Sequence, residues 1–257
     1  MERKDFLKGL GLVGLGSLAI PVINACSNND DDTVVSSSSN TNASDNTQAT
    51  DTGSSSSSST CTTTPSETEG PFPTKSPSTL VKSDIISDRT GVPFTINITI
   101  KNKNANCAAL AGALVDIWHC DKDGYYSEYG GTSMQTVNYT TVHFLRGRQV
   151  TDTNGLVTFK SIFPGWYQSR ATHIHVHIYS ASGTSLLVTQ IAFPEGSGSA
   201  VVLVNASTAN GYTKGMTGYT YNANDNVFSD SASSEMSTVT GSIADGFVLT
   251  HTINVAG

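Results

Sequence analysis

The segment HIHVHIYS, residues 173–180, alternates histidine with aliphatic side chains, and it holds three of the six histidines in the chain. In a β-strand, successive side chains point to opposite faces of the sheet. The three histidines therefore share one face of the predicted strand, and the three aliphatic residues between them share the other. The chain has to bury that apolar face while it gathers the imidazole rings on the opposite side.

Other segments have the composition and spacing of strands, and turn residues such as Gly, Asp and Pro separate them. They are PFTINITIKN (93–102), ALVDIWHC (113–120), GLVTFKSI (155–162), LLVTQIAF (186–193) and GFVLTHTINV near the end. The turn ASGT makes LLVTQIAF the expected hairpin neighbour of the histidine strand. No segment after residue 26 shows a helical period. We expect an all-β fold, a β-sandwich or a barrel.

The charge pattern excludes one class of partner. Charged residues make up 14% of the chain, and the net charge is −7. No basic stripe is present, and proteins that bind nucleic acids normally carry one. We therefore expect no nucleic-acid partner.

The first 26 residues are typical of an export signal. Arg3, Lys4 and Lys8 precede an apolar segment that is too short to span a membrane stably. The segment ends in INAC, which resembles the lipobox of bacterial lipoproteins, with Cys26 as the lipid-bearing residue. RKDFLK is similar to a twin-arginine signal with one Arg replaced by Lys. We expect an exported protein, anchored by lipid at Cys26 to the periplasmic or cell-surface face of the outer membrane, with no other membrane contact.

The composition divides the rest of the chain in two. Residues 27–63 are mostly Ser, Thr, Asn and Asp, which cannot bury enough apolar surface to fold, so we expect a disordered linker. Residues 64–257 form the expected folded domain. If Cys26 carries lipid, three cysteines remain (Cys61, Cys107 and Cys120), so at most one intrachain disulfide forms. An exported protein permits it, and the sequence leaves its pairing open.

Histidines at alternate strand positions are suited to binding a metal. Neighbouring histidines on one face lie ~7 Å apart at Cα, so two imidazoles can converge on one ion at ~2 Å from each. Zinc, copper and iron sites all use this spacing. Tyr167 precedes His173 by six residues, after a Pro-Gly turn, and Tyr126 follows the turn DKDG. A free tyrosine has a pKa of ~10, so a phenolate ligand near neutral pH favours a hard Lewis acid, ferric iron.

Several segments together resemble the intradiol ring-cleavage dioxygenases, which bind non-haem Fe(III) through two Tyr and two His. They are TPSETEGPFP (64–73), GALVDIWHCDKDGYYSEY (112–129), FLRGRQVTDTNGLVTFKSIFPGWYQSRATHIHV (144–176), TQIAF (189–193) and NDNVF (224–228). They span most of the expected domain in the family's order. The resemblance implies a β-sandwich that cleaves a catechol between its two hydroxylated carbons with O2, giving a muconate-type diacid.

By the same resemblance, the Fe(III) ligands are Tyr126, Tyr167, His173 and His175. Two phenolates and a bound hydroxide balance the three charges of ferric iron. A catechol dianion then replaces Tyr167 and the hydroxide, and these groups take up the two protons that the catechol loses. Neutrality matters because desolvated charge is costly.

The resemblance also assigns residues around the metal. Arg170 matches an arginine that stabilises negative charge developing on the substrate, and Gln190 matches a pocket glutamine. His177 matches no ligand, and we expect it to be a hydrogen-bonded histidine beyond the site. Asp225 matches a family position and is equally suited to fastening a loop. The partners expected are a small catecholic substrate and O2. The particular catechol and the oligomeric state stay open, and a homodimer is one option.

Two other functions are compatible with parts of this pattern. In the first, His173 and His175 bind zinc with a third histidine, His119 or His143. In the second, a tethered β-sandwich only binds aromatic molecules or partners at the cell surface. A colourless zinc protein would support the first, and an absence of O2 uptake with any catechol would support the second.

Overall fold

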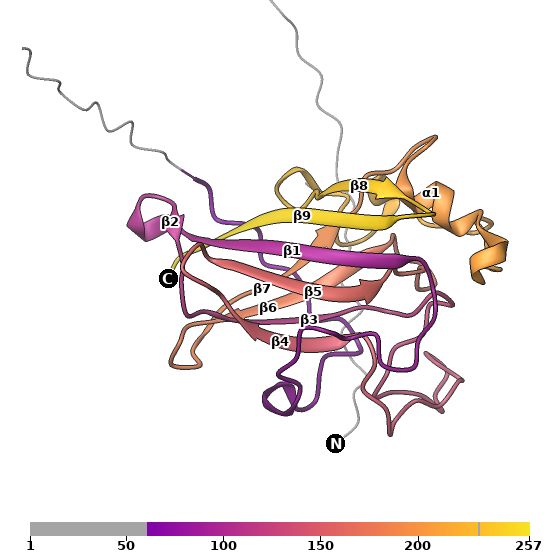
Figure 1. Cartoon of the computed structure of the whole chain (residues 1–257), viewed down its shortest axis with the longest axis horizontal. Helices are drawn as coiled ribbons and strands as arrows, with labels where there is room; N and C mark the ends of the chain where they lie inside the picture. The colour runs from indigo at the N-terminus through magenta and orange to yellow at the C-terminus, as the bar shows by residue number, and fades with distance from the viewer. Residues whose placement is uncertain (1–60, 231) are drawn as a thin grey trace, which may run out of the picture. The chain divides into compact units, whose positions relative to one another are not determined.

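The computed structural model describes residues 61–230 and 232–257, which form two β-sheets (Figure 1). One sheet contains β1 (Pro93–Asn102), β2 (Ala108–Ala109), β5 (Leu156–Ile162), β8 (Thr238–Ser242) and β9 (Gly246–Val255). The other contains β3 (Leu114–Trp118), β4 (Arg146–Val150), β6 (His173–Tyr179) and β7 (Ser185–Ala192). The all-β fold expected from the sequence is confirmed.

Strand pairing places the histidine strand inside its sheet. The order of the four-stranded sheet is β4-β3-β6-β7, and every neighbouring pair is antiparallel. In this register, His175 lies between Trp118 on β3 and Gln190 on β7. In the five-stranded sheet, β1 runs parallel to β9 and antiparallel to β2 and β5. The C-terminal strand thus completes this sheet beside β1.

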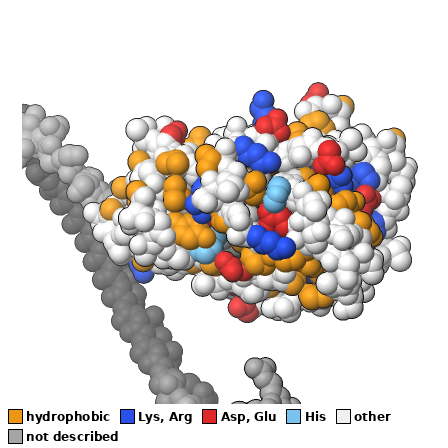
Figure 2. All heavy atoms as spheres, turned by 90° about the horizontal axis from the view of Figure 1, so that it is seen from below, with side chains coloured by type: hydrophobic (Ala, Val, Ile, Leu, Met, Phe, Trp, Pro, Cys, Tyr) orange, Lys and Arg blue, Asp and Glu red, His pale blue; other side chains and the backbone are white. Residues whose placement is uncertain are grey.

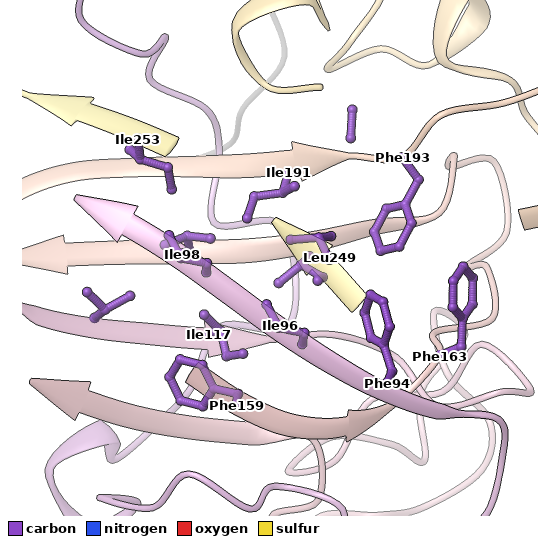
Figure 3. Close-up of a cluster of buried hydrophobic side chains, with 14 of the residues drawn as sticks. Phe94, Ile96, Ile98, Ile117, Phe159, Phe163, Ile191, Phe193, Leu249 and Ile253 are labelled. Atoms are coloured by element: carbon purple, nitrogen blue, oxygen red, sulfur yellow. The ribbon is translucent and has the colours of Figure 1, made fainter. Parts of the chain in front are cut away.

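The core lies between the two sheets, where the aliphatic faces of the strands meet. On β1, the alternate residues Phe94, Ile96 and Ile98 are buried. Figure 3 shows these side chains with Ile191 of β7 and Leu249 of β9 in one cluster. The aliphatic residues of β6 belong to the same cluster. The histidines of β6 therefore point away from the core, onto the outer face of the four-stranded sheet.

Residues 64–75, which we call the strap, cross that outer face. Glu67 N donates to Val188 O on β7 (2.8 Å), and Thr68 O accepts from Gln190 Nε2 (2.8 Å). Further along the strap, Phe72 O accepts from Arg146 Nη1 on β4 (2.9 Å). The strap thereby covers the histidines from above, which explains how polar side chains on the outer face become buried.

The structure contains one short α-helix that the sequence pattern did not predict, α1 (Ala200–Asn205). Six residues are too few to show a clear helical period. Its start follows ordinary rules, because the Ser199 side chain accepts from Val202 N and caps the first turn. The 3-10 segments are η1 (Pro77–Thr79), η2 (Lys103–Ala105), η3 (Thr208–Asn210), η4 (Asn222–Asn224) and η5 (Ala232–Ser234). Strands β2, β4 and β8 were also not predicted as separate strands.

The predicted export signal and most of the predicted linker lie outside the described residues. Residues 61–63, which the composition placed in the linker, are attached to the domain. A disulfide joins Cys61 to Cys107, and Thr62 O accepts from Asn254 Nδ2 (2.9 Å). Cys120 is a buried free thiol, which resolves the pairing that the sequence left open. Across the described part of the chain, no helix has the length and apolar character to cross a membrane.

Figure 2 shows one face of the molecule, where basic and acidic side chains lie close to one another among uncharged polar atoms. Hydrophobic atoms on this face form separate small areas. On this face, positive charge is not collected into a broad patch.

Candidate metal centre

Three side chains bring nitrogen and oxygen atoms together under the strap. The hydroxyl oxygen of Tyr126 lies 3.1 Å from His173 Nε2 and 3.4 Å from His175 Nε2, and the two Nε2 atoms lie 3.0 Å apart. Two donors that are each ~2.1 Å from one ion lie ~3.0–3.4 Å apart when the angle between them is ~90–109°. The triangle therefore has the size that a single metal ion requires.

The β6 strand and its neighbours hold the two imidazoles in place. Trp118 stacks on His175 with ring centroids 4.9 Å apart and planes 1° apart. In the strap, a Cβ added to Gly70 would lie 3.1 Å from His175 Cε1, at a backbone φ of +67°. Glycine at this position lets the strap approach the ring in a conformation that other residues rarely adopt.

The hydrogen bonds and the burial of the imidazoles leave their nitrogens available. His173 Nδ1 lies 2.6 Å from Ala171 O, so Nδ1 carries the proton and Nε2 presents its lone pair. Burial, and then the nearby Arg170 charge, lower the pKa of His173 to about 3. Burial and the neighbouring His173 also lower the pKa of His175 well below its ordinary value. Both rings are therefore neutral near pH 7.

Tyr126 is fixed by its backbone and by a stacked ring. Gln135 Oε1 accepts from Tyr126 N (2.7 Å), and Gln135 Nε2 donates to Tyr126 O (2.8 Å). The Phe72 ring from the strap stacks on the Tyr126 ring, with centroids 4.8 Å apart. Sequence reasoning missed Gln135, because nothing in a single sequence marks a loop residue that binds the backbone nine positions away.

Tyr167 lies in the same region, but its hydroxyl is directed elsewhere. It donates to Met134 O (2.9 Å), while the Tyr167 ring lies 6.0 Å from the Tyr126 ring. Of the four ligands predicted from the sequence, the structure thus brings three donor atoms together. The fourth residue lines the cavity with its phenol hydrogen-bonded to a loop carbonyl.

The other predicted residues form one hydrogen-bonded group, of which Arg170 lines the cavity beside the donors. Arg170 Nε donates to Asp225 Oδ2 (2.8 Å), and Arg170 Nη2 donates to Gln190 Oε1 (2.7 Å). Asp225 is fully buried and also accepts from Ala171 N (2.7 Å) and Val227 N (2.8 Å). Asp225 thus both fastens its loop and orients the guanidinium.

A cavity of about 440 Å³ opens onto the three donors. Phe72 and Tyr167 contribute aromatic walls, Arg170 contributes the guanidinium, and Gln168 and Asn226 are polar parts of the lining. Small-molecule sites have volumes of roughly 300–1,000 Å³, with mainly apolar walls and a few placed polar groups. The cavity fits a small aromatic molecule.

The remaining histidines considered from the sequence do not join the donors. His119 Nδ1 lies 2.8 Å from Cys120 O, and its Nε2 lies 2.7 Å from Ser161 Oγ. His143 Nδ1 pairs with Glu128. Within residues 61–230 and 232–257, no group of three or more His, Cys, Asp or Glu residues could hold a metal ion. The zinc interpretation therefore lacks its third histidine, whereas a tyrosine supplies the third donor here.

His177 has the role expected for it. Its Nε2 lies 2.8 Å from Ser185 Oγ, and its Nδ1 lies 3.0 Å from Glu69 Oε1 in the strap. It lies on the same face of β6 as the two donor histidines, but it contacts the strap and the neighbouring strand β7 instead of the donors.

Comparisons with known proteins agree with this arrangement. A family model described as Dioxygenase matches residues 68–224. An intradiol ring-cleavage dioxygenase structure from Tetranychus urticae is similar, with 27% identity and a TM-score of 0.66, over 76% of this chain and 95% of that chain. The dioxygenase domain of a carbohydrate-binding fusion protein from Streptomyces sp. SirexAA-E shares the fold, with 24% identity and a TM-score of 0.54, over 75% of this chain and 97% of that one.

A curated relative, chlorocatechol 1,2-dioxygenase from Rhodococcus opacus, is 29% identical over 143 residues. The matched region covers 48% of this chain and 51% of the relative, so the chain spans about half the length of that protein. The family match covers more than half of the chain and includes all three donors. The chain belongs to the intradiol ring-cleavage dioxygenases.

Proposed function

We propose that this protein is a non-haem Fe(III) enzyme that cleaves a catechol between its two hydroxylated carbons with O2, giving a muconate-type diacid. The observation that carries the proposal is the triangle formed by the Tyr126 hydroxyl oxygen and the Nε2 atoms of His173 and His175. Those residues would hold the iron, and Tyr167 is the fourth ligand that the family resemblance implies.

The chemistry of the donor set fits a ferric ion. Burial raises the pKa of Tyr126 well above its ordinary value, so the phenol does not ionise there without a strong positive charge beside it. Two neutral imidazoles and a phenolate suit a hard trivalent ion that accepts both nitrogen and oxygen. When bound, ferric iron would supply Lewis-acid activation and orientation of the catechol.

Residues of the chain itself would shield that centre, take up a proton from the substrate and stabilise charge on it. Phe72 stacks on the Tyr126 ring and would shield one side of the donors from water. If Tyr167 binds as a phenolate, it would take up one proton that a substrate hydroxyl releases, and the resulting phenol is the form that donates to Met134 O here. Arg170, oriented by Asp225 and Gln190, would stabilise negative charge that develops on the ring.

We also propose that the protein is exported and held at the bacterial cell envelope by lipid on Cys26. The disulfide between Cys61 and Cys107 supports this proposal, because such bonds persist mainly outside the reducing cytosol. Expression of the full chain and of Cys26→Ser tests it. We expect the first in the membrane fraction and the second in the released fraction, and equal distribution would contradict the anchor.

Metal analysis and turnover test the enzymatic proposal together. Reconstituted protein should contain one iron per chain, absorb visible light through phenolate-to-iron charge transfer, and take up O2 with a catechol. Tyr126→Phe and His175→Ala should lose the colour. The matched control is His177→Ala, on the same strand face, which should keep iron and colour. A colourless zinc protein, or a full complement of iron without O2 uptake on any catechol, would contradict the proposal.

A further inference from the structure

We infer that this cavity selects catechols whose ring substituents are uncharged and discriminates against catechols that carry a carboxylate on the ring. The inference rests on the proposed function and concerns the same cavity. Four observations support it: the charge of the lining, the pairing of its guanidinium, the carboxylates around that pair, and the neutral groups at the mouth.

The cavity lining holds little ionic charge to pair with a substrate anion. Among the described residues that line the cavity, Arg170 is the only one that ionises apart from the three donors and Tyr167, and none is Lys, Asp or Glu. A carboxylate leaving water needs a cation or several hydrogen bonds to compensate for the lost hydration. Arg170 is therefore the only side chain in the lining that could supply such a charge.

The Arg170 guanidinium is already paired with a carboxylate. Its Nε lies 2.8 Å from Asp225 Oδ2, and Asp225 is fully buried, so this pair is little screened by solvent. Arg170 Nη2 is also bonded to Gln190 Oε1 (2.7 Å). A substrate carboxylate would have to share one guanidinium with Asp225, which places two like charges beside each other.

Further carboxyl groups lie close to the pair. Burial and the charge of Asp230 raise the pKa of Glu67, which also interacts with Arg170 and Asp225. Glu67 belongs to the strap, next to the cavity-lining Thr68. Asp225 is bonded to the guanidinium, Glu67 interacts with both of them, and Asp230 lies near Glu67, so carboxyl groups outnumber the single cation here. This arrangement disfavours a substrate carboxylate and leaves a neutral substituent unaffected.

The mouth of the cavity offers neutral hydrogen-bonding groups instead. Gln168, Ser169 and Asn226 line the cavity and are exposed. Their amides and hydroxyl can donate to or accept from an ester, amide, ether or hydroxyl on the ring. These substituents lose less hydration than a carboxylate when they enter, so they suit this mouth better.

A matched substrate set tests the inference in the iron-loaded enzyme. We would compare 3,4-dihydroxybenzoate with its methyl ester and its primary amide, which keep the ring and change only the charged group. We expect kcat/KM for the ester and the amide to exceed that for the acid by roughly tenfold or more. Anaerobic binding of the same three molecules, by calorimetry, should give the same order and separates recognition from the electronic effect of the substituent.

A variant with an added positive charge provides a second test of the inference. Asn226→Lys adds a cation at the mouth and should raise the ratio of acid to amide, in binding and in kcat/KM, by roughly fivefold or more. The control Asn226→Gln should leave that ratio near the wild-type value. Equal or tighter binding of the acid by wild type, or a ratio unmoved by Asn226→Lys, would overturn the inference. Failure of the iron-loaded enzyme to take up O2 with these three molecules or with any other catechol would overturn the proposed function, while the binding order would still decide this inference.

Discussion

Glu235 provides a test of how burial controls stability beside the candidate site. Its side chain is fully buried, and the Thr189 side chain lies beside its carboxyl group. Burial raises the pKa of Glu235 from 4.5 to about 8, and the charges of Glu67 and Asp230 add to the rise. In the folded protein the group is therefore protonated at pH 7, whereas in the unfolded chain it is ionised.

The sign of the effect follows from this difference. Because the folded state holds the proton more tightly, the contribution to the free energy of unfolding is complete below pH 4.5 and is lost as the pH rises to about 8. One unit of pKa corresponds to roughly 1.4 kcal/mol, which sets an upper limit of about 5 kcal/mol. Relaxation and solvent penetration reduce such values. We therefore expect the free energy of unfolding of wild type to fall by about 2–3 kcal/mol through this residue as the pH rises.

Urea unfolding of wild type and Glu235→Gln between pH 5 and pH 8.5 measures that loss. Glutamine is neutral throughout, so the free energy of unfolding of the variant should fall less with pH, by about 2–3 kcal/mol over this range. The other titrating groups contribute equally to the free energy of unfolding of both proteins, so their contributions cancel in the comparison. The control is Asp245→Asn, whose exposed carboxylate bonds Ser242 at the surface, and its pH profile should follow wild type. Parallel profiles for wild type and Glu235→Gln would refute the assignment of a buried, protonated carboxyl.

Two further changes test other parts of the structure. The disulfide joins cysteines that are 46 residues apart in sequence and so restricts the unfolded chain. Replacing Cys61 and Cys107 with alanine should therefore lower the free energy of unfolding by about 4 kcal/mol. An unchanged urea midpoint would contradict that contribution. Gln135→Leu removes the partners of the Tyr126 backbone and should weaken iron binding roughly 10–100-fold, measured against a competing chelator. Wild-type affinity in Gln135→Leu would show that the backbone contacts do not position the phenol.

Strands with one apolar face were predictable, and those without one were not. PFTINITIKN alternates regularly, and β1 occupies that segment. Strand β4 has the sequence RGRQV, which lacks an alternating apolar pattern. Arg146 of β4 is nevertheless fully buried, because Phe72 O and the Ser127 carbonyl accept from its guanidinium. Partners that distant in sequence cannot be inferred from the local pattern.

The candidate site, too, was only partly predictable from the sequence. The spacing of His173 and His175 implied that both rings could reach one ion, and their Nε2 atoms lie 3.0 Å apart. The convergence of Tyr126 with them came from the family resemblance, since Tyr126 lies in the irregular segment between β3 and β4, which has no periodic pattern. The sequence did not reveal that the Tyr167 phenol would bond to the Met134 carbonyl. That contact depends on how two irregular loops pack.

The two faces of β6 connect the stability of the core to the geometry of the site. Ile174 is fully buried between the sheets, and the histidines on either side of it carry the donor nitrogens on the opposite face. A shift of one residue in the pairing of β6 would move the aliphatic side chains outward and the imidazoles into the core. Burial of the aliphatic face therefore excludes the alternative register. The same burial fixes which side chains lie beneath Gly70 of the strap. Precise donor placement in this protein is thus a consequence of how strongly the apolar core selects the register of one strand.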